Sequence, residues 1–390
     1  MAIVNRIGNF HDDMTAWRRD LHQHPELGFE EERTSRFVAE KLAEFGVDEV
    51  HTGIARTGVV GVLRAGSGSR AIGLRADMDA LPIQEVPGRP HGSKNPGKMH
   101  ACGHDGHTTM LLGAARYLAE TRNFDGTVYL IFQPAEETQG GGQVMVQEGL
   151  FERFPAEQVF GLHNWPRKPV GTFGVRAGPM MAAADRFEIT IEGQGGHAAT
   201  PHLCRDPLVA AAQIVTALQT IVARNVDPIE RGVLTVTQIH GGDAYNVIPQ
   251  TATLIGTGRS FTPAVRDLLE RRLGEIATGV GQALGVSVDC RYERGYPPTV
   301  NYEAETELAA EAAADVAGIE KVDREPDPVM GAEDFAYMLN ERPGCYIFMG
   351  NGGGPDAPML HNPDYDFNDE ALPYGASYWA RLVERLLPAR

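Results

Sequence analysis

Strands and helices alternate along the first half of this 390-residue chain, and this alternation restricts the possible folds more than any other feature. The runs "GVVGVLRAG" (58–66) and "GTVYLIFQPAEE" (126–137) begin as buried strands. Between them, "TTMLLGAARYLAE" (108–120) repeats apolar residues at helical spacing. The order predicts an α/β domain with a mixed, mostly parallel sheet flanked by helices. Further expected elements are helices at 12–24, 31–45 and 141–151, and strands at 71–81 and 158–166.

The pattern changes near residue 183. "DRFEITIEG" (185–193) alternates as a half-buried strand does, and the segments that follow complete the order strand-helix-strand-strand-helix-strand, which is typical of a ferredoxin-like α+β unit. We therefore predict a catalytic domain formed by residues 1–183 and 297–390, interrupted by an inserted domain at 184–296. The expected elements after the first strand are a helix at 206–224, strands at 232–242 and 251–261, a helix at 262–284 and a strand at 287–295.

Composition narrows the possible partners and location. A net charge of −17 argues against nucleic acid and anionic membranes as partners. No apolar run approaches the roughly 18 residues that span a bilayer, and the first residues lack the apolar core of a signal peptide. The 4 cysteines form no CxxC pair, so we expect no disulfide framework and a cytoplasmic location.

The stretch "MHACGHDGH" (99–107) concentrates side chains that bind metal ions. Cys102 and His104 stand on either side of a glycine, which lets a loop turn both toward one divalent ion. In proteins with parallel sheets, bound molecules and ions lie beyond the carboxyl ends of the strands. In this chain, polar groups follow several of the predicted strands. These groups are Asp77, Asp79, Glu136, Glu137 and His163, with His361 in a later loop. For each of them an ordinary polar loop is the alternative interpretation.

The adjacent Glu136 and Glu137 would point to opposite sides of an extended segment, so both can face one site only if the chain bends after Pro134. One carboxylate would then bind metal, and the other would take a proton from a water. One thiolate, one carboxylate and three imidazoles suit two ions that share ligands. Cys102 acting as a nucleophile with a histidine partner is a competing interpretation, and His107 is not expected to be a ligand.

Seven motifs occur in a fixed order: "RADMDALP", "MHACGHDGH", "PAEE", "GLHNWP", "GGHAATPH", "GGDAYNVIP" and "GAEDF". In this order, over residues 12–386, the chain resembles the metal-dependent amidohydrolase and aminoacylase peptidase family, in its hippurate hydrolase and auxin-amino-acid-conjugate hydrolase branch. The resemblance implies a zinc-peptidase-like catalytic domain, an inserted lid or dimerisation domain, and a homodimer or homotetramer. It also implies two divalent ions per subunit, zinc or manganese, with cobalt or nickel compatible.

The same resemblance implies roles for individual residues. Glu136 resembles the general base, and His197 resembles a residue that reaches the scissile carbonyl, often in the active site of the partner subunit. Asn246 and Arg259 match positions that hold the carbonyl or the free carboxylate of the substrate. The implied metal ligands are Cys102, His104, Glu137, His163 and His361.

One motif departs from the wider family, because Arg75 replaces the histidine ligand of an HxDxxP motif. This branch commonly shows that replacement, with a cysteine as the substitute donor, and Asp77 is expected to orient a ligand histidine. The implied reaction is hydrolysis of N-acyl or N-aroyl amino acids to a carboxylic acid and a free amino acid. A dipeptidase, a carbamoylase, a diamino-acid deacylase and a non-catalytic metal-bearing binding protein are the alternatives.

Overall fold

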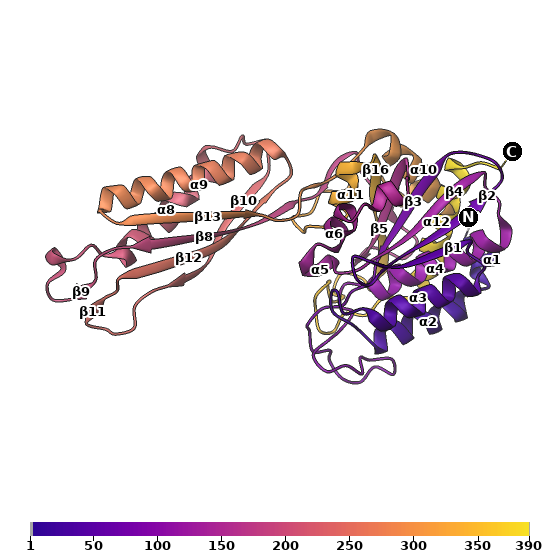
Figure 1. Cartoon of the computed structure of the whole chain (residues 1–390), viewed down its shortest axis with the longest axis horizontal. Coiled ribbons are helices and arrows are strands. Elements are labelled where there is room, and N and C mark those ends of the chain that lie inside the picture. The colour runs from indigo at the N-terminus through magenta and orange to yellow at the C-terminus, as the bar shows by residue number, and fades with distance from the viewer. Residues whose placement is uncertain (1–2, 390) are drawn as a thin grey trace. The chain divides into compact units, whose positions relative to one another are not determined.

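The computed structural model describes residues 3–389, apart from the side chain of Thr138. The chain forms two compact units (Figure 1). Unit 1 consists of Met1–Met180, Val300–Asp327 and Asp334–Arg390, and unit 2 of Met181–Thr299 and Pro328–Glu333. The insertion predicted from the sequence covers residues 184–296, and unit 2 also takes in the short segment 328–333.

An eight-stranded sheet forms the centre of unit 1, in the order β1-β2-β4-β3-β5-β16-β6-β15. Its middle strands β4, β3, β5 and β16 run parallel, whereas β1, β2 and β4 pair antiparallel. The sheet is therefore mixed with a parallel centre, as predicted. Its strands are β1 Glu49–Ile54, β2 Gly58–Ala65, β3 Ala71–Asp77, β4 Gly126–Gln133, β5 Gln158–Pro166, β6 Phe173–Gly174, β15 Val322–Asp323 and β16 Gly344–Gly352.

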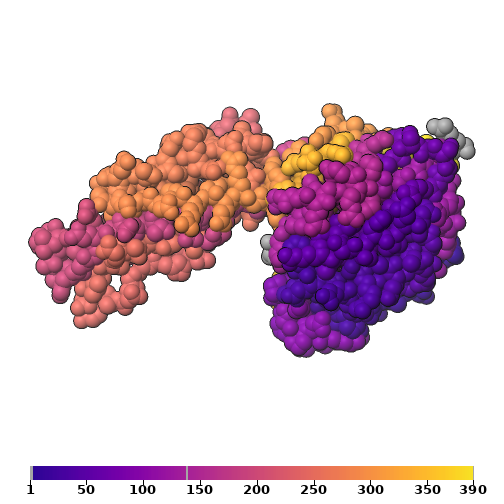
Figure 2. All heavy atoms as spheres, in the orientation of Figure 1, coloured from indigo at the N-terminus to yellow at the C-terminus, as the bar shows by residue number. Residues whose placement is uncertain are grey.

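Helices cover this sheet and form a large apolar core with it. The core joins Leu74 and Leu130 of the sheet to Leu111, Ala309 and Trp379 of three helices. In Figure 2 the N-terminal residues, in indigo, form most of the visible face of unit 1. The helices are α1 Asn5–Gly8, α2 His11–Gln23, α3 Glu32–Glu44, α4 His104–Thr121, α5 Glu136–Gln139, α6 Gly141–Gln147, α7 Leu150–Arg153, α10 Glu303–Ala317, α11 Ala336–Glu341 and α12 Leu372–Leu386.

Unit 2 has the predicted ferredoxin-like order of elements. Its sheet, β10-β12-β8-β13, is antiparallel throughout, and two helices pack on it. The strands are β8 Ala183–Glu192, β10 Gly232–His240, β12 Thr251–Ser260 and β13 Ser287–Arg294, and the helices are α8 Pro207–Arg224 and α9 Pro263–Leu284. The short strands are β7 Gly178–Met181, β9 Gly196–His197, β11 Val247–Ile248 and β14 Thr299–Asn301, of which β7 pairs with β14 and β9 with β11.

Helix α8 is the one described helix long and apolar enough to cross a membrane by length and composition. Its apolar side chains Ala210, Ile214, Leu218 and Ile221 are instead buried in the core of unit 2. An amphipathic helix on a sheet accounts for this composition.

Candidate metal centre

The predicted metal donors of unit 1 gather where the parallel strands end. Cys102 and His104 lie at the start of α4, Glu136 and Glu137 follow β4, and His163 lies on β5. Gly103 between the first two has φ 92°, and a Cβ there would lie 2.3 Å from the Nδ2 atom of Asn164. Only glycine fits this turn, which directs Cys102 and His104 to the same side.

One group of donors combines Cys102, His104 and His163, all buried, with ligand atoms within 4.8 Å of one another. The Cys102 Sγ lies 3.4 Å from the His163 Nε2. The Nδ1 of His104 is 2.9 Å from the main-chain oxygen of Asp79, and the Nδ1 of His163 is 2.7 Å from that of Asn164. Because a carbonyl oxygen only accepts, both Nδ1 atoms donate and both Nε2 lone pairs are left for the site.

A second group combines Cys102, Glu137 and His361 and shares the cysteine with the first. The His361 Nε2 lies 3.3 Å from the Glu137 Oε1. His361 has φ 65° and a half-exposed side chain, and its main-chain N–H donates to the Ala101 oxygen at 2.8 Å. The structure therefore brings all five predicted ligands together from four separate segments of unit 1.

Two buried atoms of this centre lack a hydrogen-bond partner, namely His104 Nε2 and Glu137 Oε1. Such orphaned atoms are costly unless something else satisfies them. A thiolate, a carboxylate and imidazoles are donors that borderline divalent ions accept. The residues present therefore fit bound divalent cations.

The two glutamates face the same site because the chain bends one residue before them. Ala135 has φ 54°, and Glu136 and Glu137 then begin the short helix α5. The N–H of Ala135 donates to the Glu31 Oε1 at 2.8 Å. Glu136 and Glu137 both lie within 4.8 Å of the His104 donor atom. The bend that the sequence required is therefore a left-handed residue held by a buried carboxylate.

Negative charge accumulates around these donors. Burial raises the pKa of the Cys102 thiol well above its usual value, and Glu137 and Glu136 raise it further. Burial opposes a charge on His104, but Asp77 and Asp79 overcome it and raise the pKa of that imidazole to about 10. Cations neutralise such a field and allow Cys102 to ionise.

Asp77 does not orient the ligand histidine as the sequence analysis expected. Its Oδ1 accepts from the Nδ1 of His107 at 2.6 Å, and its Oδ2 accepts from Arg75 at 2.7 Å. His107 also accepts the main-chain N–H of Asn164 at 3.0 Å, so both its nitrogens are engaged and it is not a donor to the centre. Asp79 is the residue that orients His104.

The remaining predicted site residues lie in unit 2, where His197 and Asn246 are neighbours and Arg259 lies apart from them. His197 is in β9 and pairs with Val247, next to the exposed Asn246. Arg259 is near the other end of β12, where it pairs with Ala184. Figure 1 shows β9 and β11 at one end of the unit's sheet.

Comparison with known proteins identifies this arrangement. The family model of peptidase family M20/M25/M40 matches residues 73–385. The chain belongs to this family. Its M20 fold is shared with a solved Bacillus subtilis protein, YxeP, described as a dinuclear metal-binding peptidase; the two are 34% identical with a TM-score of 0.86, over 97% of this chain and 99% of that one. A two-ion centre in this M20 chain agrees with the two donor groups.

Two curated relatives of this M20 protein are hydrolases of amino-acid conjugates. The hippurate hydrolase of Campylobacter jejuni is 41% identical over 99% of this chain and 100% of its own length. The IAA-amino acid hydrolase ILR1-like 4 of Arabidopsis thaliana is 42% identical over 97% of this chain and 87% of its own length. The branch that the motifs indicated is thereby confirmed.

Proposed function

We propose that this M20 protein hydrolyses the amide bond of N-acyl or N-aroyl amino acids and releases a carboxylic acid and a free amino acid. The observation that carries the proposal is the convergence of five metal donors, two of which, His104 and Glu137, lie beside a further buried carboxylate, Glu136. Relatives that match nearly the whole chain are named for this kind of reaction. We further propose zinc or manganese as the metal and the cytoplasm as the location.

Divalent ions, when bound to Cys102, His104, Glu137, His163 and His361, supply an acidified water and polarise the acyl carbonyl. The Glu136 carboxylate takes a proton from the attacking water as its oxygen bonds to the acyl carbon. The same carboxylate then returns the proton to the amide nitrogen, so that the carbon–nitrogen bond breaks and the amine leaves neutral. Glu136 is suited to this role because the bend at Ala135 directs it to the site.

The residues of unit 2 would bind the rest of the substrate. The Arg259 guanidinium is assigned to the free carboxylate of the amino acid, with which its planar fork matches in geometry. His197 and Asn246 are assigned to the scissile carbonyl. Strand β12 begins at Thr251, just after β11, and Arg259 lies eight residues further along the same strand. Eight residues of strand span about 27 Å, which is far more than the length of an N-acyl amino acid. We therefore propose a homodimer in which these two ends of unit 2 serve different active sites.

Release of amino acids from a small panel of substrates tests the proposal. The panel contains N-benzoylglycine, N-acetyl amino acids, a dipeptide and an N-carbamoyl amino acid. Each is incubated with the enzyme as purified, after chelation, and after zinc or manganese is added back. We expect chelator-sensitive release, restored by metal, from the N-acyl or N-aroyl compounds. Release from the dipeptide or the carbamoyl compound alone would contradict the proposed substrate class.

A further inference from the structure

His361 differs from the other donors of the metal centre in its surroundings. The side chains of His104 and Glu137 are 1% and 8% exposed, whereas that of His361 is 52% exposed. Little packing therefore restrains its imidazole, and its position depends on the backbone that carries it. That backbone bonds to Ala101 at His361 itself and then runs through the exposed residues 362–364. Tyr365 is buried and donates its hydroxyl to the Asn164 Oδ1 at 2.7 Å, so the exposed stretch lies between two fixed points.

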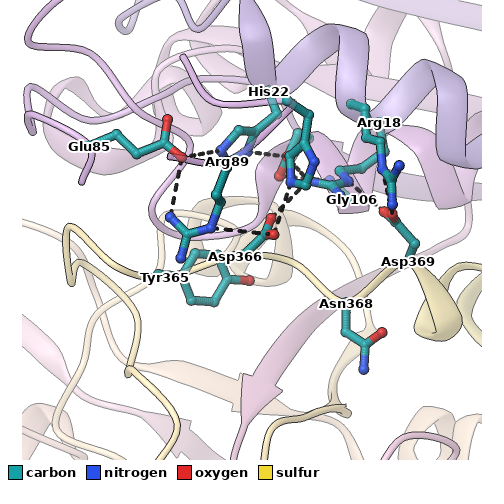
Figure 3. Close-up of polar contacts among 12 residues, drawn as sticks. Arg18, His22, Glu85, Arg89, Gly106, Tyr365, Asp366, Asn368 and Asp369 are labelled. Atoms are coloured by element: carbon teal, nitrogen blue, oxygen red, sulfur yellow. Dashed lines mark hydrogen bonds and ion pairs between the residues drawn. The ribbon is translucent and has the colours of Figure 1, made fainter. Parts of the chain in front are cut away.

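A second segment holds this backbone two to five residues after His361. The Nη2 of Arg89 donates to the main-chain oxygen of Asp364 at 2.6 Å and to its carboxylate at 2.8 Å. The same guanidinium lies 3.6 Å from the Asp366 carboxylate. Nearby, Val86 donates its main-chain N–H to the Pro363 oxygen at 3.0 Å. Figure 3 shows Arg89 between Glu85 and Asp366.

Arg89 is held in turn by the buried carboxylate of Glu85. Its Nη1 bonds to the Glu85 carboxylate at 3.3 Å, and Glu85 is 4% exposed. The same carboxylate oxygen lies 3.3 Å from the Nε2 of His22 on helix α2. Asp366 in turn accepts from His91 at 2.9 Å and from the fully buried Arg18 of the same helix at 2.9 Å. Arg89 therefore links the exposed residues after His361 to helix α2 of unit 1 through Glu85 and Asp366.

We propose that Arg89, with Glu85, Asp364 and Asp366, forms a clamp that positions His361 for one of the two metal ions. The inference rests on the proposed role of His361 as a ligand. Arg89 is a positioning residue, because its guanidinium bonds to Glu85 and to the segment after His361 and not to the donor atoms. Groups that orient metal ligands typically change metal affinity 10- to 100-fold when they are removed.

The test is a titration of chelator-stripped enzyme with Mn²⁺, followed by isothermal calorimetry and by metal content after dialysis against buffered Mn²⁺. For Arg89→Met we expect roughly 10-fold weaker binding of one ion and unchanged binding of the other. Coulomb's law alone predicts the opposite sign, because removal of a nearby positive charge favours a cation. Arg89→Lys keeps the charge but not the fork and should give a smaller loss.

Two further variants separate the possible outcomes. Arg64→Met removes an exposed arginine that pairs with Glu49, away from the 361–366 segment, and should leave both affinities unchanged. His361→Ala should lose the same ion that Arg89→Met weakens. If His361→Ala loses an ion and Arg89→Met binds both normally, the clamp is wrong and the ligand assignment stands.

If His361→Ala retains both ions, the ligand assignment fails and the clamp with it. Asp364→Asn, at a side chain that is 60% exposed, replaces Arg89→Met should that variant not fold. Weaker binding of both ions in either variant would also overturn the inference, because the clamp acts on His361 alone.

Discussion

The resemblance places Arg75 where the wider family has a histidine ligand, and in this chain Arg75 is a structural cation. Its guanidinium is fully buried and bonds to Asp77, Gln133 and Asp334 at 2.7, 2.8 and 3.1 Å. Asp334 also accepts the main-chain N–H of Gly142 at 2.7 Å. Arg75 thus neutralises buried carboxylates beside the centre without contributing a donor to it.

Loss of this cation should be costly to the fold. Arg75→Met leaves Asp77 and Asp334 buried without their guanidinium, so the free energy of unfolding should fall by about 3–5 kcal/mol. Urea unfolding of the metal-free protein measures the loss. Arg64→Met is the matched control, and we expect it to change stability by less than about 1 kcal/mol, as exposed pairs do. Equal effects of the two substitutions would show that Arg75 is not a structural cation.

Glu136→Gln should separate proton transfer from metal binding. The amide keeps the size of the side chain but cannot accept a proton, so kcat should fall roughly 10²- to 10⁴-fold. Both ions should remain, because the five donors are unchanged. Metal content and amino-acid release are measured on the same preparation. Activity within a few-fold of the parent enzyme would remove Glu136 as the base.

For individual residues, the sequence indicated the metal donors but not the groups that orient them. Cys102 and His104 could be found because their spacing is local. The contact of Arg75 with Asp334 joins residues far apart in the sequence, and the contact of Arg89 with Asp364 does so as well. His104 is oriented by the main-chain oxygen of Asp79 at 2.9 Å and by its carboxylate at 3.2 Å, and the sequence did not show which of the two nearby aspartates, Asp77 or Asp79, reaches this imidazole.

Among the elements, helices α2 and α4 are joined by buried charges next to the centre. His22 of α2 bonds to Asp105 of α4 at 2.8 Å and lies 3.3 Å from Glu85 (Figure 3). Burial disfavours the imidazolium, but hydrogen bonds to Asp105 and Glu85 overcome this and raise the pKa of His22 to about 9. His22 is therefore charged in the folded protein across the neutral range.

This pKa gives a pH-dependent contribution to stability. Because the folded pKa exceeds the unfolded value of about 6.5, the contribution is complete below pH 6.5 and is lost as the pH rises to about 9. His22→Gln should therefore destabilise the protein more at pH 6 than at pH 9.5, by on the order of 3 kcal/mol. Urea unfolding of both proteins at several pH values gives this difference. If His22→Gln lowers the free energy of unfolding equally at every pH, His22 is neutral in the folded protein.

Most elements could be predicted because their apolar periodicity is strong. The strand at 158–166 and the helices near 12–24, 31–45 and 262–284 lie within about two residues of their predicted bounds. Strand β1 was missed because it lies at the sheet edge and only its last residue, Ile54, is buried, so it shows no alternation. The helix expected at 141–151 is broken at Gly149, which has φ 84°.

For the whole molecule, the separation of His197 from Arg259 along unit 2 predicts complementation between inactive subunits. Glu136→Ala and His197→Ala should each be nearly inactive alone. One of the two sites of a mixed dimer combines both intact residues, and random reassociation makes about half of the dimers mixed. The mixture should therefore recover up to about a quarter of the parent activity. Activity of subunits dissociated and reassociated together is compared with that of each variant treated alone. No recovery in verified mixed dimers would place His197 in the active site of its own subunit.

The order of strands in unit 1 has a consequence for synthesis on the ribosome. Strand β16 lies between β5 and β6, yet it is made long after both, once all of unit 2 has been translated. At ~5–20 residues per second, one edge of β5 remains without its neighbouring strand β16 for on the order of 10–40 s. Unit 2 has its own core and can fold during this interval, whereas the nascent catalytic sheet presents an open edge to other chains. Slower translation of residues 181–343 should therefore increase aggregation of the newly made protein.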